Sequence, residues 1–555
     1  MITRPAFATL LIVGLGLAFV TDHAPITAAD PHARVDAIFA PYRAAGSPGC
    51  AVGVTRAGRP LLTGAYGWAD IEREVPIAAD TVFEAGSVSK QFTAAAVIML
   101  AQQGRLSFDE DVRKYLPEIP RFRSRITIGH LLSHTSGMRD WGTILEAAGR
   151  PRGTRVYSPA DVLAVVGRQR NLNFQPGAEY LYNNTGYSLL PLLVERIAGV
   201  SFVEFTERHL FEPLGMRHTQ WRDDLERVVE RRAIAYKADG GGFLVNMPME
   251  NVIGHAGLLT TIGDLLIWNE ALDSGTLGRT LRRELERPTR LTSGRSIAYA
   301  RGLVVSKYRG ANEISHSGAT FGYRSFVARY PDDRLAVAVL CNAAGIDAPQ
   351  LAHQVADIFL SPPPPSKPGP APMEIDPNIL ASRAGLFRNR RTGEPLNLAV
   401  AGGTLRSATG ETLIPLSTSE FRFAGSARRI EFASKPGGEG VRLITDEGEA
   451  VPLDRVTPVD LDPTRALEYE GRYVSDEAEA AYAVRIVDGG LVLEQPGAAA
   501  MGLAPSYADG FTTAQGWIVR FVRDAQGQVT SMSLGLPRVR DLRFERMHDQ
   551  GADLP

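Results

Sequence analysis

A proline-rich segment constrains this chain more than any other feature, because it separates two parts that must fold apart from each other. Residues 361–372 contain seven prolines, four of them consecutive at positions 362–365. Proline fixes its φ angle and has no backbone N–H, so such a run forms a stiff spacer rather than a helix or strand. A chain of 555 residues is also too long to fold around a single hydrophobic core. We predict a folded domain at 30–361, a linker at 362–377 and further domains behind it.

The first 29 residues have the pattern of a secretory signal peptide. One arginine lies within the first five residues, residues 6–20 are apolar, and small residues follow at 26–29. The apolar run is too short to favour a membrane-spanning helix. We therefore predict cleavage near Ala29 and an exported protein, periplasmic or secreted, without a stable membrane anchor.

The region 30–361 has strand patterns at both ends and helical patterns between them, which predicts an α/β domain. Helices are expected at 34–45 and 353–360, and a mostly helical stretch runs from 87 to 277. Strand patterns occur at 51–55, 61–66, 302–305, 313–316, 323–330 and 335–341. We expect one antiparallel sheet built from both ends of the domain, flanked by helices and interrupted by a helical insertion.

Behind the linker, short alternating strands and glycine-rich turns indicate all-β structure, and the pattern occurs twice. Residues 385–387 (Gly-Leu-Phe) match residues 471–473 (Gly-Arg-Tyr), and ordered matches continue at offsets of between 86 and 90 residues. We predict two barrel-like copies, at 378–460 and 461–555. Intertwined halves of a single barrel are the alternative.

The two cysteines, Cys50 and Cys341, each border a predicted strand. If those strands pair antiparallel the two sulfurs lie close together, and export permits a disulfide. Two buried free thiols are an equal alternative.

Ser87 and Lys90 form the segment with the clearest chemistry. They lie three residues apart where an Ala-Gly turn enters an alanine-rich helical run, so their side chains share one helical face. A serine hydroxyl becomes nucleophilic when a base removes its proton, and a partly desolvated lysine can be that base. The N–H groups of a first helical turn also favour an oxyanion. An isolated Ser-x-x-Lys match is more often a solvated pair, so further segments are needed.

A second segment contains Tyr182 and Asn184, two residues apart in a turn-like stretch, so that both face the same way on an extended chain. Near a lysine ammonium the Tyr182 phenol would have a lowered pKa and shuttle a proton, while the Asn184 amide orients a carbonyl or the lysine. A Tyr- and Asn-rich turn that caps a helix is the alternative.

A third segment is His316-Ser317-Gly318-Ala319, on a predicted strand. Gly318 would allow a substrate backbone to approach closely, and the Ala319 N–H would join the Ser87 N–H as an oxyanion donor. His316 taken alone is more often a structural histidine.

Together and in this order, the three segments resemble the penicillin-recognising serine hydrolases, and within them the group of class C β-lactamases, D-alanyl-D-alanine carboxypeptidases, D-aminopeptidases and related esterases. The resemblance covers about residues 34–360. Supporting stretches lie at 126–138, 213–216, 257–261 and 339–342. By position, the resemblance implies that Ser87 is the nucleophile, Lys90 assists its activation, Tyr182 is the acid/base partner and Asn184 orients the substrate.

The chain departs from this group at His316-Ser317-Gly318, where many members carry Lys-Thr-Gly. A histidine gives a substrate carboxylate only a partial, pH-dependent charge, which weakens the interpretation as a β-lactamase. The group also implies deacylation by Tyr182 and Lys90, and which of them is the base stays open. His130 and His134 are assigned structural roles, because no Gly-x-Ser-x-Gly elbow accompanies them. The tail resembles the paired barrels of D-aminopeptidases, and by analogy an unidentified barrel loop overhangs the cleft.

The sequence thus predicts an exported serine hydrolase that forms an acyl-enzyme with amides or esters, with D-amino-acid peptides as the preferred class. A class C-like β-lactamase, a carboxylesterase, and a non-enzymatic sensor or carrier acting through the barrels are the alternatives. A net charge of −2 with interspersed signs argues against a nucleic-acid partner. No metal- or nucleotide-binding motif occurs, so we expect no cofactor and a small-molecule or peptide substrate. The oligomeric state stays open.

Overall fold

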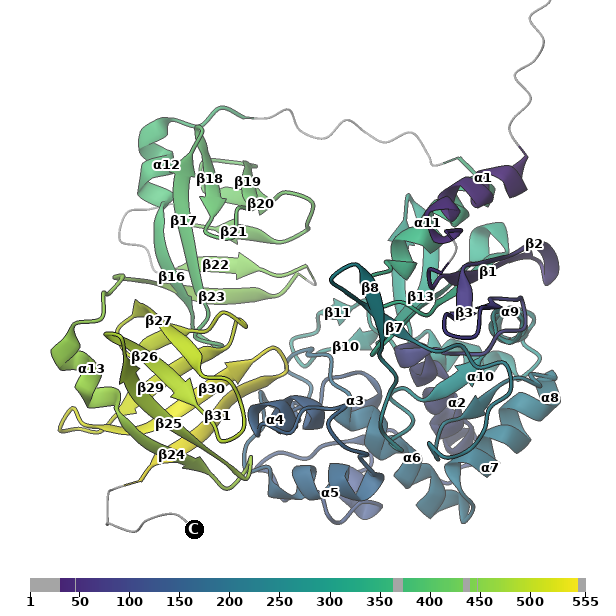
Figure 1. Cartoon of the computed structure of the whole chain (residues 1–555), viewed down its shortest axis with the longest axis horizontal. Coiled ribbons are helices and arrows are strands. Elements are labelled where there is room, and N and C mark those ends of the chain that lie inside the picture. Colours follow the sequence, from purple (N-terminus) through teal and green to yellow (C-terminus); the bar gives the residue numbers. More distant parts are fainter. Residues whose placement is uncertain (1–29, 45, 363–372, 433–439, 447, 548–555) are drawn as a thin grey trace, which may run out of the picture.

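The computed structural model describes residues 30–44, 46–362, 373–432, 440–446 and 448–547. The predicted signal peptide and most of the predicted linker lie outside the described residues. An α/β domain stands beside two β-barrels (Figure 1). Within the described ranges, none of the helices combines the length and the apolar character that crossing a membrane requires.

A six-stranded antiparallel sheet, in the order β12-β13-β14-β15-β1-β2, forms the centre of the α/β domain. Its strands are β1 (Cys50–Arg56), β2 (Arg59–Tyr66), β12 (Val304–Tyr308), β13 (Ala311–Thr320), β14 (Tyr323–Tyr330) and β15 (Leu335–Cys341). The prediction of one sheet built from both ends of the domain is confirmed, because β1 pairs with β15. That pairing places Cys50 opposite Cys341, and the two form a disulfide across 291 residues of sequence.

Helices cover both faces of this sheet. On one face α11 (Ala348–Phe359) packs on β14 and β15, with α1 (Pro31–Ile38) against it; α1 is shorter than the helix expected at 34–45 and is followed by a 3-10 turn at Ala40–Tyr42. On the other face lies α9 (Ile262–Ser274), and the remaining helices of the insertion pack beyond it. These are α2 (Ser89–Gln102), α3 (Ile128–Leu132), α4 (Trp141–Ala147), α5 (Pro159–Arg168), α6 (Thr185–Ala198), α7 (Phe202–Thr206), α8 (Glu212–Leu214) and α10 (Arg279–Leu285).

Short strands that the sequence did not predict lie before, within and after the helical stretch 87–277. They are β3 (Trp68–Asp70) with β4 (Val75–Pro76), β5 (Phe83–Glu84) with β9 (Leu258–Thr260) and β6 (Gln220–Trp221), β7 (Tyr236–Asp239) with β8 (Gly242–Val245), and β10 (Thr289–Arg290) with β11 (Ser296–Ile297). Strands of two to four residues are too short to produce a recognisable alternation.

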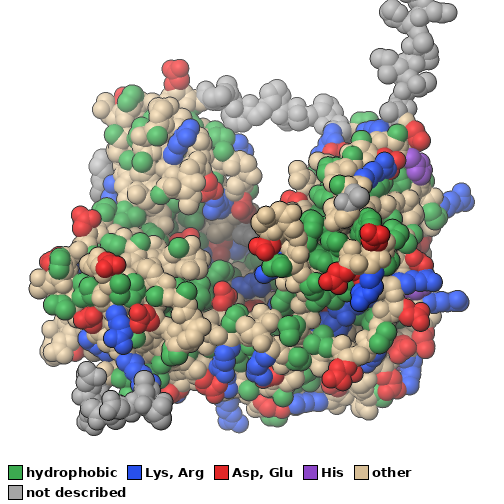
Figure 2. Space-filling model, viewed as in Figure 1, with side chains coloured by type: hydrophobic (Ala, Val, Ile, Leu, Met, Phe, Trp, Pro, Cys, Tyr) green, Lys and Arg blue, Asp and Glu red, His purple; other side chains and the backbone are tan. Residues whose placement is uncertain are grey.

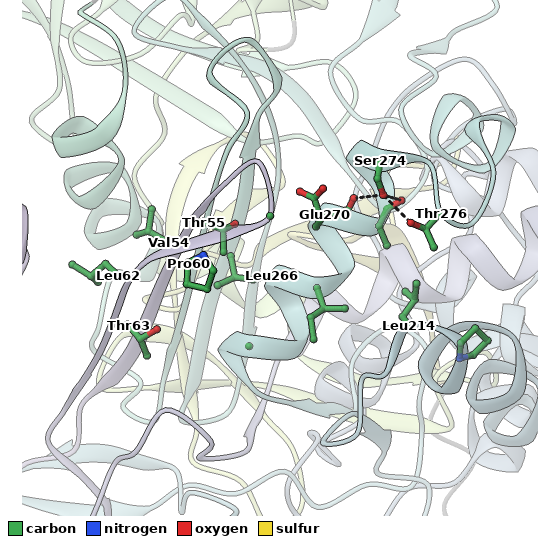
Figure 3. A pocket seen from close by; sticks show the side chains of 15 residues that line it. Val54, Thr55, Pro60, Leu62, Thr63, Leu214, Leu266, Glu270, Ser274 and Thr276 are labelled. Atoms are coloured by element: carbon green, nitrogen blue, oxygen red, sulfur yellow. Dashed lines mark hydrogen bonds between the residues drawn. The ribbon is translucent and has the colours of Figure 1, made fainter.

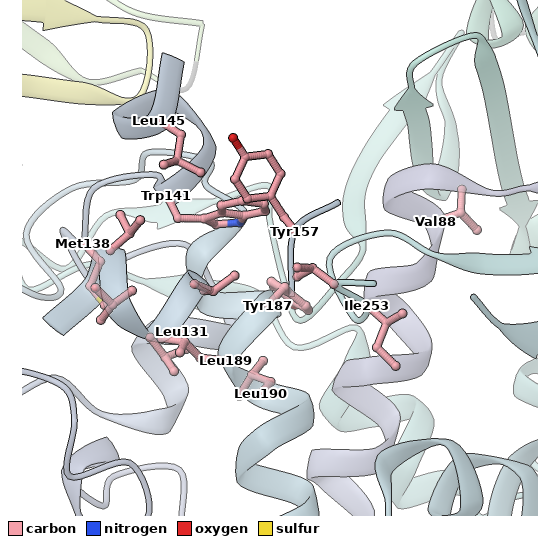
Figure 4. Packing of buried hydrophobic residues seen from close by; sticks show 14 of the residues in the cluster. Val88, Leu131, Met138, Trp141, Leu145, Tyr157, Tyr187, Leu189, Leu190 and Ile253 are labelled. Atoms are coloured by element: carbon pink, nitrogen blue, oxygen red, sulfur yellow. The ribbon is translucent and has the colours of Figure 1, made fainter. Parts of the chain in front are cut away.

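The core of the insertion surrounds α2, which is buried along most of its length. Its alanines at 94–96 are fully buried and allow α6 and α10 to approach closely. Val88, Trp141 and Tyr187 belong to the same hydrophobic cluster, and Figure 4 shows Trp141 and Tyr187 among the helices and Val88 at the turn that enters α2. The helix that carries Lys90 is therefore held rigidly from several sides.

A cavity of 480 Å³ lies between α9 and the β1–β2 hairpin (Figure 3). Its lining includes Val54, Leu62, Leu266 and Glu270. None of the residues singled out for chemistry lines it, so it is a separate feature of the domain.

The tail forms two closed eight-stranded antiparallel barrels, which confirms two copies and rejects the alternative of intertwined halves. The first contains β16 (Gly385–Asn389), β17 (Pro395–Ala401), β18 (Thr404–Ser407), β19 (Thr412–Pro415), β20 (Glu420–Phe423), β21 (Arg429–Glu431), β22 (Val441–Ile444) and β23 (Ala450–Val456). The second contains β24 (Gly471–Ser475), β25 (Ala480–Val487), β26 (Gly490–Glu494), β27 (Met501–Tyr507), β28 (Gly510–Thr512), β29 (Ile518–Arg523), β30 (Val529–Leu536) and β31 (Val539–Arg546). A helix that the sequence reading missed precedes each barrel, α12 (Pro377–Arg383) and α13 (Pro463–Tyr469).

The second barrel is docked on the α/β domain through a buried charge. The Arg139 side chain is 1% exposed and pairs with Glu477 of the barrel, which is 7% exposed. Arg139 also donates to the carbonyls of Arg540 and Asp541. A buried guanidinium with this many partners fixes the orientation of the barrel relative to the domain.

We expect Glu477→Gln to weaken this docking by about 3–5 kcal/mol, because it leaves the Arg139 charge buried without its counter-ion. Asp476→Asn is the matched control, since the ion pair of Asp476 with Arg170 is exposed on both sides and contributes about 1 kcal/mol or less. Denaturant unfolding monitored separately in each domain measures both variants. Equal effects of the two substitutions would contradict a dominant role for the buried pair.

Candidate active site

Ser87 and Lys90 are brought together by a tight turn into α2. Ser87 lies in the 3-10 turn Gly86–Val88, directly before α2 begins at Ser89. The Lys90 Nζ lies 3.0 Å from the Ser87 Oγ, 3.0 Å from the Asn184 Oδ1 and 2.7 Å from the carbonyl oxygen of His255. The predicted contact between the serine and the lysine is thus present in the structure.

The surroundings of Lys90 favour a neutral amine. Its side chain is fully buried, and burial together with the nearby Arg538 guanidinium holds the pKa of Lys90 well below its usual range. A neutral amine has two N–H donors and one lone pair. With the donors directed at Asn184 Oδ1 and His255 O, the lone pair faces the Ser87 hydroxyl and can accept its proton.

Tyr182 lies on the loop before α6, with the centroid of its ring 4.8 Å from Lys90 Nζ. Burial raises the pKa of Tyr182, and the hydroxyl of Ser87 and the charge of Arg538 offset this increase only in part. The expected lowering of its pKa is therefore wrong, because Lys90 is not the fixed cation that would stabilise a phenolate. Tyr182 is a protonated phenol here, suited to donate a proton rather than to accept one.

Strand β13 passes directly beside the Ser87 turn. A Cβ added to Gly86 would lie 2.9 Å from the Ala319 nitrogen, so the backbones of the turn and the strand are in contact. A Cβ added to Gly318 would lie 2.1 Å from the Ala85 carbonyl oxygen. Gly318 is therefore required by the packing of the protein's own turn, not by substrate approach as expected. This packing places the backbone of Ala319 directly beside the turn that carries Ser87.

His316 is 4% exposed and does not provide the expected partial charge. Burial of the ring is the main cause that lowers the pKa of His316 to about 3. The ring Nδ1 lies 2.5 Å from the Ser317 carbonyl oxygen and the Nε2 lies 3.2 Å from the Tyr299 hydroxyl, which suits a neutral ring. The Ser317 side chain is exposed, on the opposite face of the strand from His316.

His130 and His134 both have structural surroundings. The Nδ1 of His130 accepts from the Thr127 N–H at the start of α3. His134 is buried, with its ring centroid 4.2 Å from that of Tyr182 and a pKa well below the usual value because of burial. The His134 ring therefore helps to hold the Tyr182 ring in position.

Several residues that the sequence did not single out support the site from behind. Asp140 accepts from the Asn184 N–H at 2.6 Å and caps the N-terminus of α4. The Nδ1 of His255, whose carbonyl binds Lys90, lies 3.0 Å from Ser188 Oγ. The Nε2 of His255 lies 3.5 Å from Glu250, which is itself bound by Arg152. No local pattern marks these residues, because each comes from a different loop or helix end.

The second barrel also contributes to the site. The guanidinium of Arg538, in the turn between β30 and β31, lies 5.1 Å from the centroid of the Tyr182 ring. This turn is the barrel loop at the site that the sequence alone did not identify. Figure 2 shows a hollow between the barrels and the α/β domain, with charged side chains of both signs on its walls.

Comparison with known proteins finds relatives that this chain matches over most of their length. A D-aminopeptidase of Brucella anthropi is 26% identical over 533 residues, which cover 90% of this chain and 95% of that protein. The octameric penicillin-binding protein homologue from Pyrococcus abyssi superposes with a TM-score of 0.54 at 22% identity, covering 76% of this chain and 99% of that chain. The D-amino acid amidase from Ochrobactrum anthropi SV3 superposes with a TM-score of 0.51 at 21% identity, covering 59% and 97%.

The beta-lactamase family model matches residues 35–359, which is more than half of the chain and includes Ser87, Lys90, Tyr182 and β13. The chain therefore belongs to the beta-lactamase family and is a serine hydrolase.

Proposed function

We propose that this protein is an exported hydrolase that cleaves amides of D-amino acids, including D-amino-acid peptides, through an acyl-enzyme on Ser87. The observation that carries the proposal is the 3.0 Å contact between Ser87 Oγ and a fully buried Lys90 amine. The D-aminopeptidase of Brucella anthropi, similar over 90% of this chain, supports the substrate class. The apolar N-terminal pattern and the Cys50–Cys341 disulfide support export.

In the proposed acylation, Lys90 takes the proton of the Ser87 hydroxyl as the Oγ attacks the substrate carbonyl. The negative charge that develops on the carbonyl oxygen is stabilised by the N–H groups of Ser87 and Ala319. Tyr182 donates its phenolic proton to the departing nitrogen, and the proton held by Lys90 restores the phenol. Water then attacks the acyl-enzyme, with Lys90 again as the base, and releases the acid.

Intact-mass spectrometry after exposure to a penicillin, a fluorogenic ester and a D-alanyl amide tests this function. We expect the D-alanyl amide to acylate and turn over, and the penicillin to leave a long-lived adduct. Rapid turnover of a cephalosporin would instead indicate a β-lactamase. Fast hydrolysis of the ester without a preference for D-amino acids would indicate an esterase.

Tyr182→Phe should lower kcat by on the order of 10²–10⁴, because the leaving nitrogen then departs without its proton donor. The decrease should be smaller for an ester of an acidic phenol, which needs little protonation. Comparing kcat on the amide and on the ester measures the difference. An equal decrease on both substrates would remove Tyr182 from the proton transfer to the leaving group.

A further inference from the structure

We propose that Arg538 binds a carboxylate on the leaving group of the substrate, so that the second barrel contributes a specificity-determining residue to the active site. This inference rests on the proposed function, because it uses the role assigned to Tyr182. It names the feature of the substrate that the α/β domain alone does not recognise.

The turn that carries Arg538 is held in place on both sides. The Arg538 carbonyl accepts from Asn173 Nδ2 at 3.0 Å and from the Asp140 N–H at 3.4 Å. The Asn173 Oδ1 in turn accepts from the Arg540 N–H at 2.7 Å, and the Arg540 side chain binds Glu179. A turn with this many contacts to the α/β domain presents its side chain in a fixed position.

The guanidinium of Arg538 itself has few partners. It lies 4.0 Å from Asp140 Oδ2, too far for a hydrogen bond, and it forms no side-chain hydrogen bond with the residues that the structure describes. Asp140 is already engaged by the Asn184 and Thr143 N–H groups. The Arg538 side chain is 39% exposed, so its donors are accessible to a ligand from solvent.

The other cationic groups around the site are occupied. Lys90 is hydrogen-bonded on three sides, Arg152 is bound by both oxygens of Glu250, and Arg540 is bound by Glu179. His316 is neutral. An anionic substrate group would therefore find an available guanidinium at Arg538.

The position of Arg538 indicates which part of the substrate it meets. Its guanidinium lies 5.1 Å from the centroid of the ring of Tyr182, the proposed proton donor to the leaving atom. The leaving group must reach the Tyr182 hydroxyl to receive that proton, so it lies beside Arg538 as well. Planar guanidinium groups bind carboxylates through two parallel hydrogen bonds. The leaving group best suited to this site is one with a free carboxylate, such as an amino acid.

Two matched pairs of aryl esters test this inference. The two esters of a pair have the same acyl group, which is acetyl in one pair and D-alanyl in the other. Within each pair, one ester releases 3-hydroxybenzoate and the other releases 3-hydroxybenzamide. We expect kcat/KM of the wild-type protein to be about tenfold or more higher for the ester that releases the benzoate than for the ester that releases the benzamide. A charge-assisted hydrogen bond contributes about 1.5–3 kcal/mol, which accounts for this ratio. Arg538→Gln should remove this preference. The preference is the ratio of kcat/KM for the two leaving groups at one pH, so an effect of the substitution on Lys90 changes both values together and leaves the ratio unaffected. Arg538→Lys should keep part of the preference.

Arg543→Gln is the matched control, because it removes the same charge from an exposed position on β31 of the same barrel. It should leave the preference unchanged. A carboxylate preference that survives in Arg538→Gln, or its absence in the wild type, would overturn the inference and leave Arg538 a docking residue only. If the protein hydrolyses the acetyl esters but not the D-alanyl esters, the proposed substrate class is wrong. The acetyl pair would then still measure the effect of Arg538.

Discussion

Replacement of Ser87 by alanine is expected to lower kcat by a factor on the order of 10⁴–10⁶, as for other catalytic nucleophiles. The Ser87 Oγ is the atom that becomes acylated, and within the described part of the chain Lys90 has no second hydroxyl among its hydrogen-bond partners that could replace it. Its other hydrogen-bond partners are an amide oxygen and a carbonyl oxygen. Steady-state hydrolysis of a D-alanyl amide measures the decrease. More than a tenth of wild-type turnover in this variant would contradict the assignment.

Ser89→Ala is the control for this experiment, because Ser89 belongs to the same motif and is also buried. Its Oγ donates to the Gly86 carbonyl and accepts from the Leu258 N–H, so it connects the Ser87 turn to β9. The variant should lose about 1–3 kcal/mol of stability from unsatisfied backbone groups. It should still form the acyl-enzyme, which the Ser87 variant does not.

Lys90→Met is expected to lower kcat by on the order of 10²–10⁴, since a chain of similar length fills the space but accepts no proton. Lys307→Met, at an exposed position on β12, is the control and should retain wild-type kcat. Loss of less than a factor of ten in Lys90→Met would mean that another group is the base.

The pH dependence gives a second test of Lys90. The pKa of Lys90 is lowered, first by burial and then by Arg538, so the amine becomes neutral at a pH below the usual lysine range. Activity of the wild type should therefore increase with pH through this lowered value and reach its plateau before the pH at which an exposed lysine loses its proton. In Arg538→Gln this increase should move to higher pH. A profile unchanged by Lys90→Met would contradict the assignment.

The sequence predicted the parts of the site that local spacing determines. Ser87 and Lys90 lie three residues apart at a helix start, and Tyr182 and Asn184 lie two apart on a loop; in both cases the fold keeps the expected neighbours. The pKa values of Tyr182 and His316 were not predictable, because burial sets both and burial depends on packing from distant elements.

Other features required the assembled fold. Arg538 reaches the site only because the second barrel docks through Arg139 and Glu477, and no pattern near position 538 indicates this. The helices before the barrels did have a local signal. Each begins with an aspartate cap followed by proline, Asp376-Pro377 and Asp462-Pro463, an arrangement typical of a helix start.

Labelling by a serine-directed fluorophosphonate, located by peptide mass mapping, tests directly whether Lys90 activates Ser87. We predict one label per chain, on Ser87, with little labelling in Lys90→Met and none in Ser87→Ala. Stable labelling of a different serine, or no labelling of the folded wild-type protein, would contradict the claim that Lys90 activates Ser87.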